Sequence, residues 1–85
     1  MTDETAIASE PDAELDTCGL LCPLPVLKAR KRLGQMEPGA VLSMRADDPA
    51  ARVDVPHFCA EQGHRLVATH EEADGVLRFL IARRA

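Results

Sequence analysis

The chain of 85 residues is long enough for one domain with a modest core. Its composition is 46% hydrophobic and 28% charged, with two phenylalanines and no tyrosine or tryptophan. The core must therefore be aliphatic, and aromatic platforms for nucleic-acid bases are nearly absent. The net charge of -4 argues against direct nucleic-acid binding. No apolar run is as long as a membrane span, which argues against a membrane protein.

The N-terminal segment MTDETAIASEPDA contains acidic residues, no basic residue and no hydrophobic periodicity. Such a composition is typical of a disordered segment. A secretory signal peptide would instead need a basic start and an apolar stretch. We therefore expect a disordered acidic tail over residues 1–13, a folded domain over residues 14–85 and a cytoplasmic location.

The first half of the domain predicts a strand, a helix and a second strand. Residues 14–18 alternate in polarity around Leu15 until Gly19 interrupts the strand. In residues 23–36, apolar side chains recur at helical spacing opposite basic ones, which indicates an amphipathic helix. The apolar face of this helix is formed by Val26, Ala29, Leu33 and Met36. Residues 40–46 again alternate as a strand does.

A second helix is expected after this strand. Asp48 is a suitable N-cap residue, Pro49 suits the first helical position, and Gly63 ends the helix. Pro56 lies inside the segment and removes a backbone hydrogen bond there. We therefore expect the helix either to kink or to restart at Pro56.

Two alternating segments, residues 64–71 and 76–83, complete the chain. The Asp74-Gly75 pair between them is a strong hairpin signal. The resulting order of elements is βαβαββ. The most economical way to bury their apolar faces is an α/β (α+β) two-layer sandwich, in which two helices pack on one face of a four-stranded mixed sheet.

The segment CGLLCPLP places Cys22 directly before two prolines. If Cys22 is the N-cap residue, Pro23 and Pro25 take the first and third helical positions, where amides normally lack partners. Leu24 then supplies the amide that can point at the sulfur. The helix dipole and the basic residues that follow also favour the thiolate, so we expect a lowered pKa for Cys22. Cys22 is the candidate reactive thiol, and a simple helix cap is the alternative.

The other two cysteines allow different interpretations. Cys18 is either an accessory thiol, which forms a disulfide with Cys22 or receives its sulfur, or a small residue that ends the first strand. Cys59 falls on the apolar face of the second helix and is expected in the core. An odd number of cysteines in a reducing compartment cannot pair fully, and their spacing with the histidines matches no zinc motif. We expect no metal and no cofactor.

Several charged residues are weaker candidates. A basic row on the first helix is either a docking face for an acidic partner or a solvated surface. This row consists of Lys28, Lys31 and Arg32. For Asp47 and Asp48 we favour helix capping over chemistry. If the second helix starts beside the first, Arg52 lies near Cys22.

The segments LDTCGLLCPLPVLKARKRL and DDPAARVDVPHFC together resemble the TusA/SirA family of small sulfur-carrier proteins, whose signature is Cys-Pro-x-Pro at the start of the first helix. The resemblance covers residues 14–84 and implies the two-layer fold described above. It also implies that Cys22 is the sulfur-carrying cysteine. Leu24 occupies the variable position of the motif, where some members carry a charged residue, and the family does not require Cys18.

The resemblance implies a sulfurtransferase type of function. A cysteine desulfurase, a rhodanese or a related donor protein would supply sulfane sulfur, Cys22 would carry it as a persulfide, and the thiol of an acceptor protein would receive it. Members of the family serve transfer-RNA thiolation, molybdenum-cofactor synthesis and sulfur oxidation, and the sequence does not choose among these pathways. The alternatives are a non-catalytic regulatory or protein-interaction module of the same fold, and a redox protein that uses Cys18 and Cys22 as a dithiol.

Overall fold

Four strands form one mixed sheet in the computed structural model, which describes residues 10–85. The strands are β1 (Ala13–Asp16), β2 (Val41–Ala46), β3 (Arg65–Glu71) and β4 (Leu77–Ala82). They lie in the order β1-β2-β4-β3. β1 runs parallel to β2, and β4 runs antiparallel to both of its neighbours. Because β1 and β2 are parallel, their C-terminal ends meet at one edge of the sheet.

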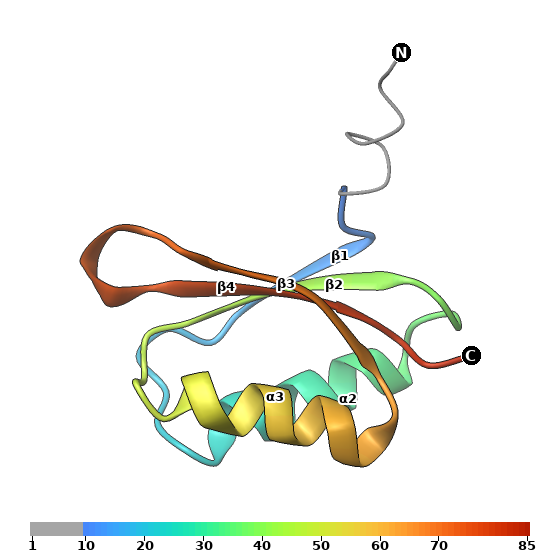
Figure 1. Ribbon diagram of the computed structural model, residues 1–85, viewed down its shortest axis with the longest axis horizontal. Helices are drawn as coiled ribbons and strands as arrows, with labels where there is room; N and C mark the ends of the chain where they lie inside the picture. Colours follow the sequence, from blue (N-terminus) through green and yellow to red (C-terminus); the bar gives the residue numbers. More distant parts are fainter. Residues whose placement is uncertain (1–9) are drawn as a thin grey trace.

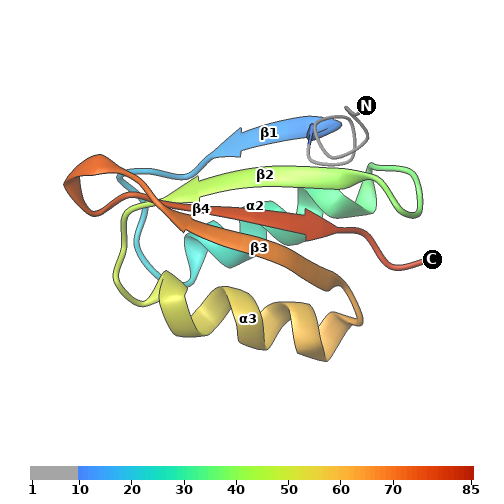
Figure 2. The ribbon, with the colours of Figure 1, turned by 45° about the horizontal axis from the view of Figure 1, so that its top comes forward.

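Two helices, α2 (Leu24–Gly34) and α3 (Ala51–Gln62), cover one face of this sheet (Figure 1). They lie side by side beneath the strands (Figure 2). A short 3-10 helix, η1 (Ala73–Gly75), joins β3 to β4 at the predicted Asp-Gly turn, and Asp74 there has a φ of 61°. The expected βαβαββ order and the two-layer sandwich with a mixed sheet are therefore confirmed.

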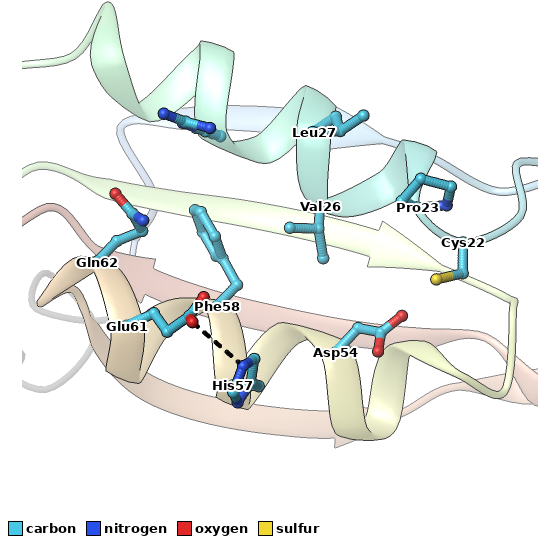
Figure 3. Close-up of a pocket in the computed structure, with 10 residues that line it drawn as sticks. Cys22, Pro23, Val26, Leu27, Asp54, His57, Phe58, Glu61 and Gln62 are labelled. Carbon is cyan, nitrogen blue, oxygen red and sulfur yellow. Dashed lines mark ion pairs between the residues drawn. The ribbon is translucent and has the colours of Figure 1, made fainter.

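The core lies between the sheet and the helices. Its largest fully buried apolar side chains are Phe79, Leu33, Leu42, Met44, Ile81 and Val55. They come from alternate positions of β2 and β4 and from the facing turns of α2 and α3, as the two periodicities require. Near the surface of this core, Val26 from α2 and Phe58 from α3 point toward each other between the helices (Figure 3). Cys59 is buried in the core, as expected.

The start of α3 differs from the sequence-based prediction. Ala50, and not Asp48, is the N-cap residue, so the helix begins two residues later than expected. Asp48 lies outside the helix and accepts a hydrogen bond from the N–H of Ala50 with its Oδ1 atom, at 3.1 Å. The physical reason is that the other carboxylate oxygen of Asp48 is bonded to the loop before α2, which holds this residue away from the helix axis.

Pro56 neither kinks α3 into two helices nor restarts it. The helix runs continuously through Pro56 and ends at Gly63, whose φ of 79° is the left-handed conformation that glycine adopts readily. Proline removes one backbone hydrogen bond from the helix. Val55 and Phe58 on either side of it are buried against the sheet, and this packing offsets the missing bond.

The sheet begins slightly earlier than the expected folded domain. β1 starts at Ala13, and Asp12 already bonds to β2. The N–H of Asp12 donates to the carbonyl oxygen of Val41 at 2.8 Å, and the N–H of Val41 donates to Asp12 Oδ2 at 2.8 Å. Most of the acidic tail predicted for residues 1–13 lies outside the described residues, which begin at residue 10.

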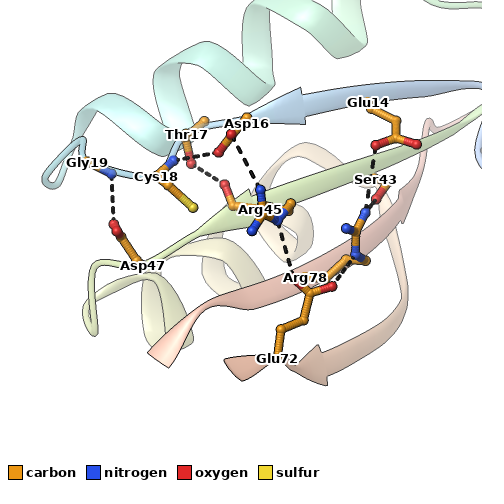
Figure 4. Close-up of polar contacts among 10 residues, drawn as sticks. All are labelled: Glu14, Asp16, Thr17, Cys18, Gly19, Ser43, Arg45, Asp47, Glu72 and Arg78. Atoms are coloured by element: carbon orange, nitrogen blue, oxygen red, sulfur yellow. Dashed lines mark hydrogen bonds and ion pairs between the residues drawn. The ribbon is translucent and has the colours of Figure 1, made fainter. Parts of the chain in front are cut away.

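The face of the sheet opposite the helices carries a cluster of charged side chains (Figure 4). The cluster consists of Glu14, Asp16, Arg45, Glu72 and Arg78. The carboxylate of Glu72 accepts a hydrogen bond from Arg78 at 2.7 Å and one from Arg45 at 3.2 Å. The bond from Arg78, followed by that from Arg45, holds the pKa of Glu72 below its usual range. Glu72 therefore ties the end of β3 to the two central strands.

Replacing Glu72 by glutamine tests the contribution of this cluster to stability. A carboxyl group with a depressed pKa in the folded state stabilises the fold above its unfolded pKa, and this contribution disappears as the pH falls through the folded pKa. We expect Glu72→Gln to lower the midpoint of urea unfolding at pH 7, and the difference from the unchanged protein to shrink between about pH 5 and about pH 2. The exposed Glu37, in the turn after α2, provides the control Glu37→Gln. Equal midpoints for Glu72→Gln and the unchanged protein at pH 7 would show that the cluster contributes no net stability.

Candidate functional site

Cys22 lies at one end of an open groove between α2 and α3 (Figure 3). Val26 and Leu27 from α2 and Phe58 from α3 supply apolar walls, and Asp54 supplies a carboxylate near the sulfur. The groove has a volume of 290 Å³, at the small end of the range for small-molecule pockets. Because the side chain of Cys22 is exposed, its sulfur is accessible to a group that another protein presents.

The backbone before Cys22 is fixed by two adjacent aspartates that follow β2. The N–H of Cys22 donates to Asp48 Oδ2 at 2.7 Å, and the N–H of Gly19 donates to Asp47 Oδ1 at 2.9 Å. The parallel pairing of β1 and β2 brings these segments to the same edge of the sheet. The sequence suggested helix capping for Asp47 and Asp48, and it missed their role as acceptors for the loop that carries Cys22. The signal for this role in the sequence was a pair of acidic residues directly after β2, the strand that runs parallel to β1.

The start of α2 also differs from the expected arrangement. Pro23 is the N-cap residue, Leu24 is the first helical residue and Pro25 is the second, so Cys22 lies one residue outside the cap. The peptide bond between Cys22 and Pro23 is cis. The N–H of Leu24 donates to the carbonyl oxygen of Leu21 at 2.9 Å, and the expected bond from this amide to the sulfur is not formed. The Leu24 amide therefore has a backbone acceptor in the turn from Leu21 to Leu24 and is not available to the sulfur.

The electrostatic environment of Cys22 is opposite to the expected one. A hydrogen bond from the thiol to the carboxylate of Asp54 is the largest influence and raises the pKa of Cys22. Some desolvation of the thiol and the negative charges of Asp54 and Asp48 act in the same direction. The expected lowering of the pKa assumed that the helix dipole would dominate, whereas two nearby carboxylates favour the protonated thiol.

Cys18 occupies a different environment from Cys22. Its side chain is half-buried and lies near Asp47 and Arg45 beside the end of β1 (Figure 4). Its N–H donates to Asp16 Oδ1 at 3.0 Å. Burial, followed by a hydrogen bond to Asp16, raises the pKa of the Cys18 thiol. Both Cys18 and Cys22 are free thiols in this structure, and Cys18 does not line the groove.

The candidate basic row lies on the side of α2 that faces β1. Lys28, Lys31 and Arg32 line a shallow hollow there with Leu15 and Gln35. Arg32 Nη1 also donates to the carbonyl oxygen of Glu14 at 3.5 Å. The structure therefore separates this row from the groove that contains Cys22, and Arg30, which is not part of the row, lines the groove.

Arg52 does not reach the groove either. Its guanidinium group pairs with Glu71 at the end of β3. Within residues 10–85, no three histidine, cysteine or acidic side chains are gathered as a metal site would require. In the same part of the chain, neither helix has the length and apolar character needed to cross a membrane.

Comparison with known proteins places the chain in a family. The family model described as Sulfurtransferase TusA matches residues 13–83. The chain belongs to the TusA family. A crystal structure of a SirA-like protein from Desulfitobacterium hafniense is similar to it, with 26% sequence identity and a TM-score of 0.76 over 86% of this chain and 99% of that chain. The family resemblance inferred from the Cys-Pro-x-Pro segment is therefore confirmed.

Asp48 provides the first test of how this TusA-family protein holds its cysteine. We expect Asp48→Ala to expose the Cys22 amide to faster hydrogen exchange and to lower the free energy of unfolding by about 1–2 kcal/mol, because bonds to both the Cys22 and Ala50 amides are lost. Asp48→Asn keeps one acceptor oxygen and should show smaller effects. Unchanged exchange of the Cys22 amide in Asp48→Ala would contradict the role assigned to this side chain.

The three thiols should also differ in accessibility. Cys59 has an exposed fraction of 2%, and burial raises its pKa to about 11. We expect iodoacetamide at pH 8 to modify Cys22 first, Cys18 more slowly, and Cys59 only after unfolding in urea. Trypsin leaves Cys59 alone in the peptide of residues 53–65, so mass spectrometry measures it separately. Modification of Cys59 at the same rate in folded and unfolded protein would contradict its burial.

Proposed function

We propose that this protein is a cytoplasmic sulfur carrier in which Cys22 accepts sulfane sulfur as a persulfide and passes it to the thiol of an acceptor protein. The observation that carries this proposal is the exposed thiol of Cys22, within a Cys-Pro-x-Pro segment, at an open groove of a TusA-family fold. Pro23, Leu24 and Pro25 complete the motif, with Pro23 as the N-cap residue and Leu24 and Pro25 as the first two residues of α2. A thiol outside the helix and fixed through its backbone is accessible to a partner while its position is maintained.

The transfer is a thiol exchange without net oxidation. Cys22 loses its proton, and its sulfur attacks the terminal sulfur of a donor persulfide, R–S–SH. An S–S bond forms at Cys22, the S–S bond of the donor breaks, and the released thiolate R–S⁻ takes up a proton. The sum is R–S–SH plus the Cys22 thiol giving R–SH plus the Cys22 persulfide. An acceptor thiolate then attacks the terminal sulfur, and the Cys22 thiol is regenerated.

Exposed leucines beside Cys22 support the use of protein partners. Leu21, Leu24 and Leu27 have exposed fractions of 68%, 45% and 49%. Apolar side chains exposed close to a reactive group are suited to contact with another protein. A cysteine desulfurase, a rhodanese or another persulfide-bearing protein is the proposed donor. Leu24, at the variable position of the motif, is well placed to influence which partner binds.

A non-catalytic interaction module is the second candidate, because the same exposed leucines would serve docking without any chemistry. The two functions differ in what they require of Cys22. A carrier needs the thiol itself, whereas a docking module needs only the surface around it. A dithiol redox protein would in addition depend on Cys18.

Sulfur loading distinguishes these functions. We expect incubation with a cysteine desulfurase and cysteine, or with a rhodanese and thiosulfate, to add one sulfur atom to the intact protein. Cys22→Ala should abolish this mass increase, because no other thiol in the described residues lies at the groove, and Cys18→Ala should retain it. Trypsin leaves Cys18 and Cys22 in one peptide, residues 1–28, so fragment ions must assign the sulfur to one of them.

The competing outcomes are separate. Sulfur on Cys18, or loss of loading in Cys18→Ala, would favour the dithiol alternative. No sulfur on a folded protein with either donor system, although iodoacetamide still reaches Cys22, would contradict the carrier function and favour the docking module.

A further inference from the structure

Asp54 faces the sulfur of Cys22 across the groove (Figure 3). Its side chain comes from the first turn of α3, whereas Cys22 directly precedes the first turn of α2. The packing of the two helices therefore brings together a nucleophile and a carboxylate that are far apart in the sequence. Nothing in the local sequence around Asp54 indicated a role in the site.

We propose that Asp54 is the positioning residue of the reactive thiol: its carboxylate accepts the hydrogen bond of the Cys22 S–H group, orients the sulfur into the groove and keeps the thiol protonated in the free protein. This inference rests on the proposed carrier function and adds a control of thiol reactivity to it. The thiolate is the nucleophile in sulfur exchange, so a group that retains the proton restrains the reaction.

The position of Asp54 is well defined by the helix that carries it. Its N–H donates to the carbonyl oxygen of Ala50 at 2.9 Å, and the neighbouring side chains of Ala51 and Val55 are buried against the core. The N-terminal turn of a helix also attracts negative charge. The carboxylate is thus held beside Cys22 by the backbone and the core, and it does not depend on a mobile loop.

The other charged groups of the site complete the same electrostatic environment. Asp48 adds a second negative charge from the loop before α3, and this charge also raises the pKa of Cys22. His57 lies one turn along α3 from Asp54 and is paired with Glu61 at 3.5 Å. Arg30 lines the groove from the second half of α2. Among these groups Asp54 has the largest influence on the pKa of the thiol, and its influence exceeds that of Asp48.

The expected consequence is a restrained thiol near neutral pH. A raised pKa means that little Cys22 is thiolate at pH 7, so small electrophiles and oxidants react slowly although the side chain is exposed. Each unit by which the pKa falls gives tenfold more thiolate well below the pKa. Because the intrinsic nucleophilicity of a thiolate falls with its pKa, the net gain in alkylation rate is about threefold per unit.

The test is the pH dependence of alkylation in Asp54→Asn. Asparagine keeps the size of the side chain and removes its charge. We expect the midpoint of the curve for Cys22 alkylation by iodoacetamide to move to lower pH, with a rate about threefold higher at pH 7 for each unit of that shift. The rate is scored on the fragment ions of peptide 1–28 that separate Cys22 from Cys18. Glu61→Gln is the matched control, because it removes a carboxylate from the same groove and the same helix.

The outcomes separate this inference from the function on which it rests. An unchanged midpoint in Asp54→Asn, with circular dichroism showing a folded protein, would overturn the role of Asp54 even if sulfur still loads onto Cys22. An equal shift in Glu61→Gln would also overturn it, because general groove charge would then explain the effect. Alkylation needs no sulfur donor, so the expected shift together with a failure to load sulfur would contradict the carrier function and leave the role of Asp54 supported.

Discussion

The hydrogen bond from the backbone N–H of Cys22 to Asp48 Oδ2, at 2.7 Å, is the contact on which the geometry of the site depends. Bonds between an N–H group and a carboxylate are stronger than those between neutral groups. With the bond from Gly19 to Asp47, it joins the loop after β1 to the end of β2. The second oxygen of Asp48 reaches the start of α3, so one side chain fixes the position of the cysteine relative to both helices. The thiol itself is not needed for this support and remains free to react.

The local charges then decide the state of the sulfur. A helix N-terminus attracts a thiolate most strongly when its amides point directly at the sulfur, and the effect falls off within the first turn. Here the Leu24 amide is bonded to Leu21, and Cys22 lies outside the cap. The carboxylate of Asp54 faces the thiol (Figure 3) and has the largest influence on its pKa, and Asp48 adds a further negative charge. The nearby carboxylates therefore outweigh the distant dipole, and the thiol is the favoured form at rest.

The parts of this molecule that follow from local patterns were predictable from the sequence. Alternation indicated the strand β2, helical spacing in α2 placed Ala29 and Leu33 on its apolar face, and the two prolines singled out Cys22. The cap of α2 was displaced by one residue because the Leu24 amide found a backbone partner, a competition that spacing does not reveal. The contacts made by Asp48 and Asp54 join segments far apart in the chain. Their effect on the Cys22 pKa could be recognised only when β1, β2 and the two helices were assembled.

Cys59 and Cys22 show why a raised pKa alone does not define the role of a thiol. Burial in the core raises the pKa of Cys59, and the same burial prevents reagents from reaching it. Cys22 is exposed, and a specific carboxylate is the main cause of its raised pKa. A proton held by one hydrogen bond at the surface can be released when a partner changes the groove, whereas the desolvation of a core thiol changes only when the protein unfolds. Restraint by Asp54 is therefore compatible with a thiol that must react repeatedly, and restraint by burial is not.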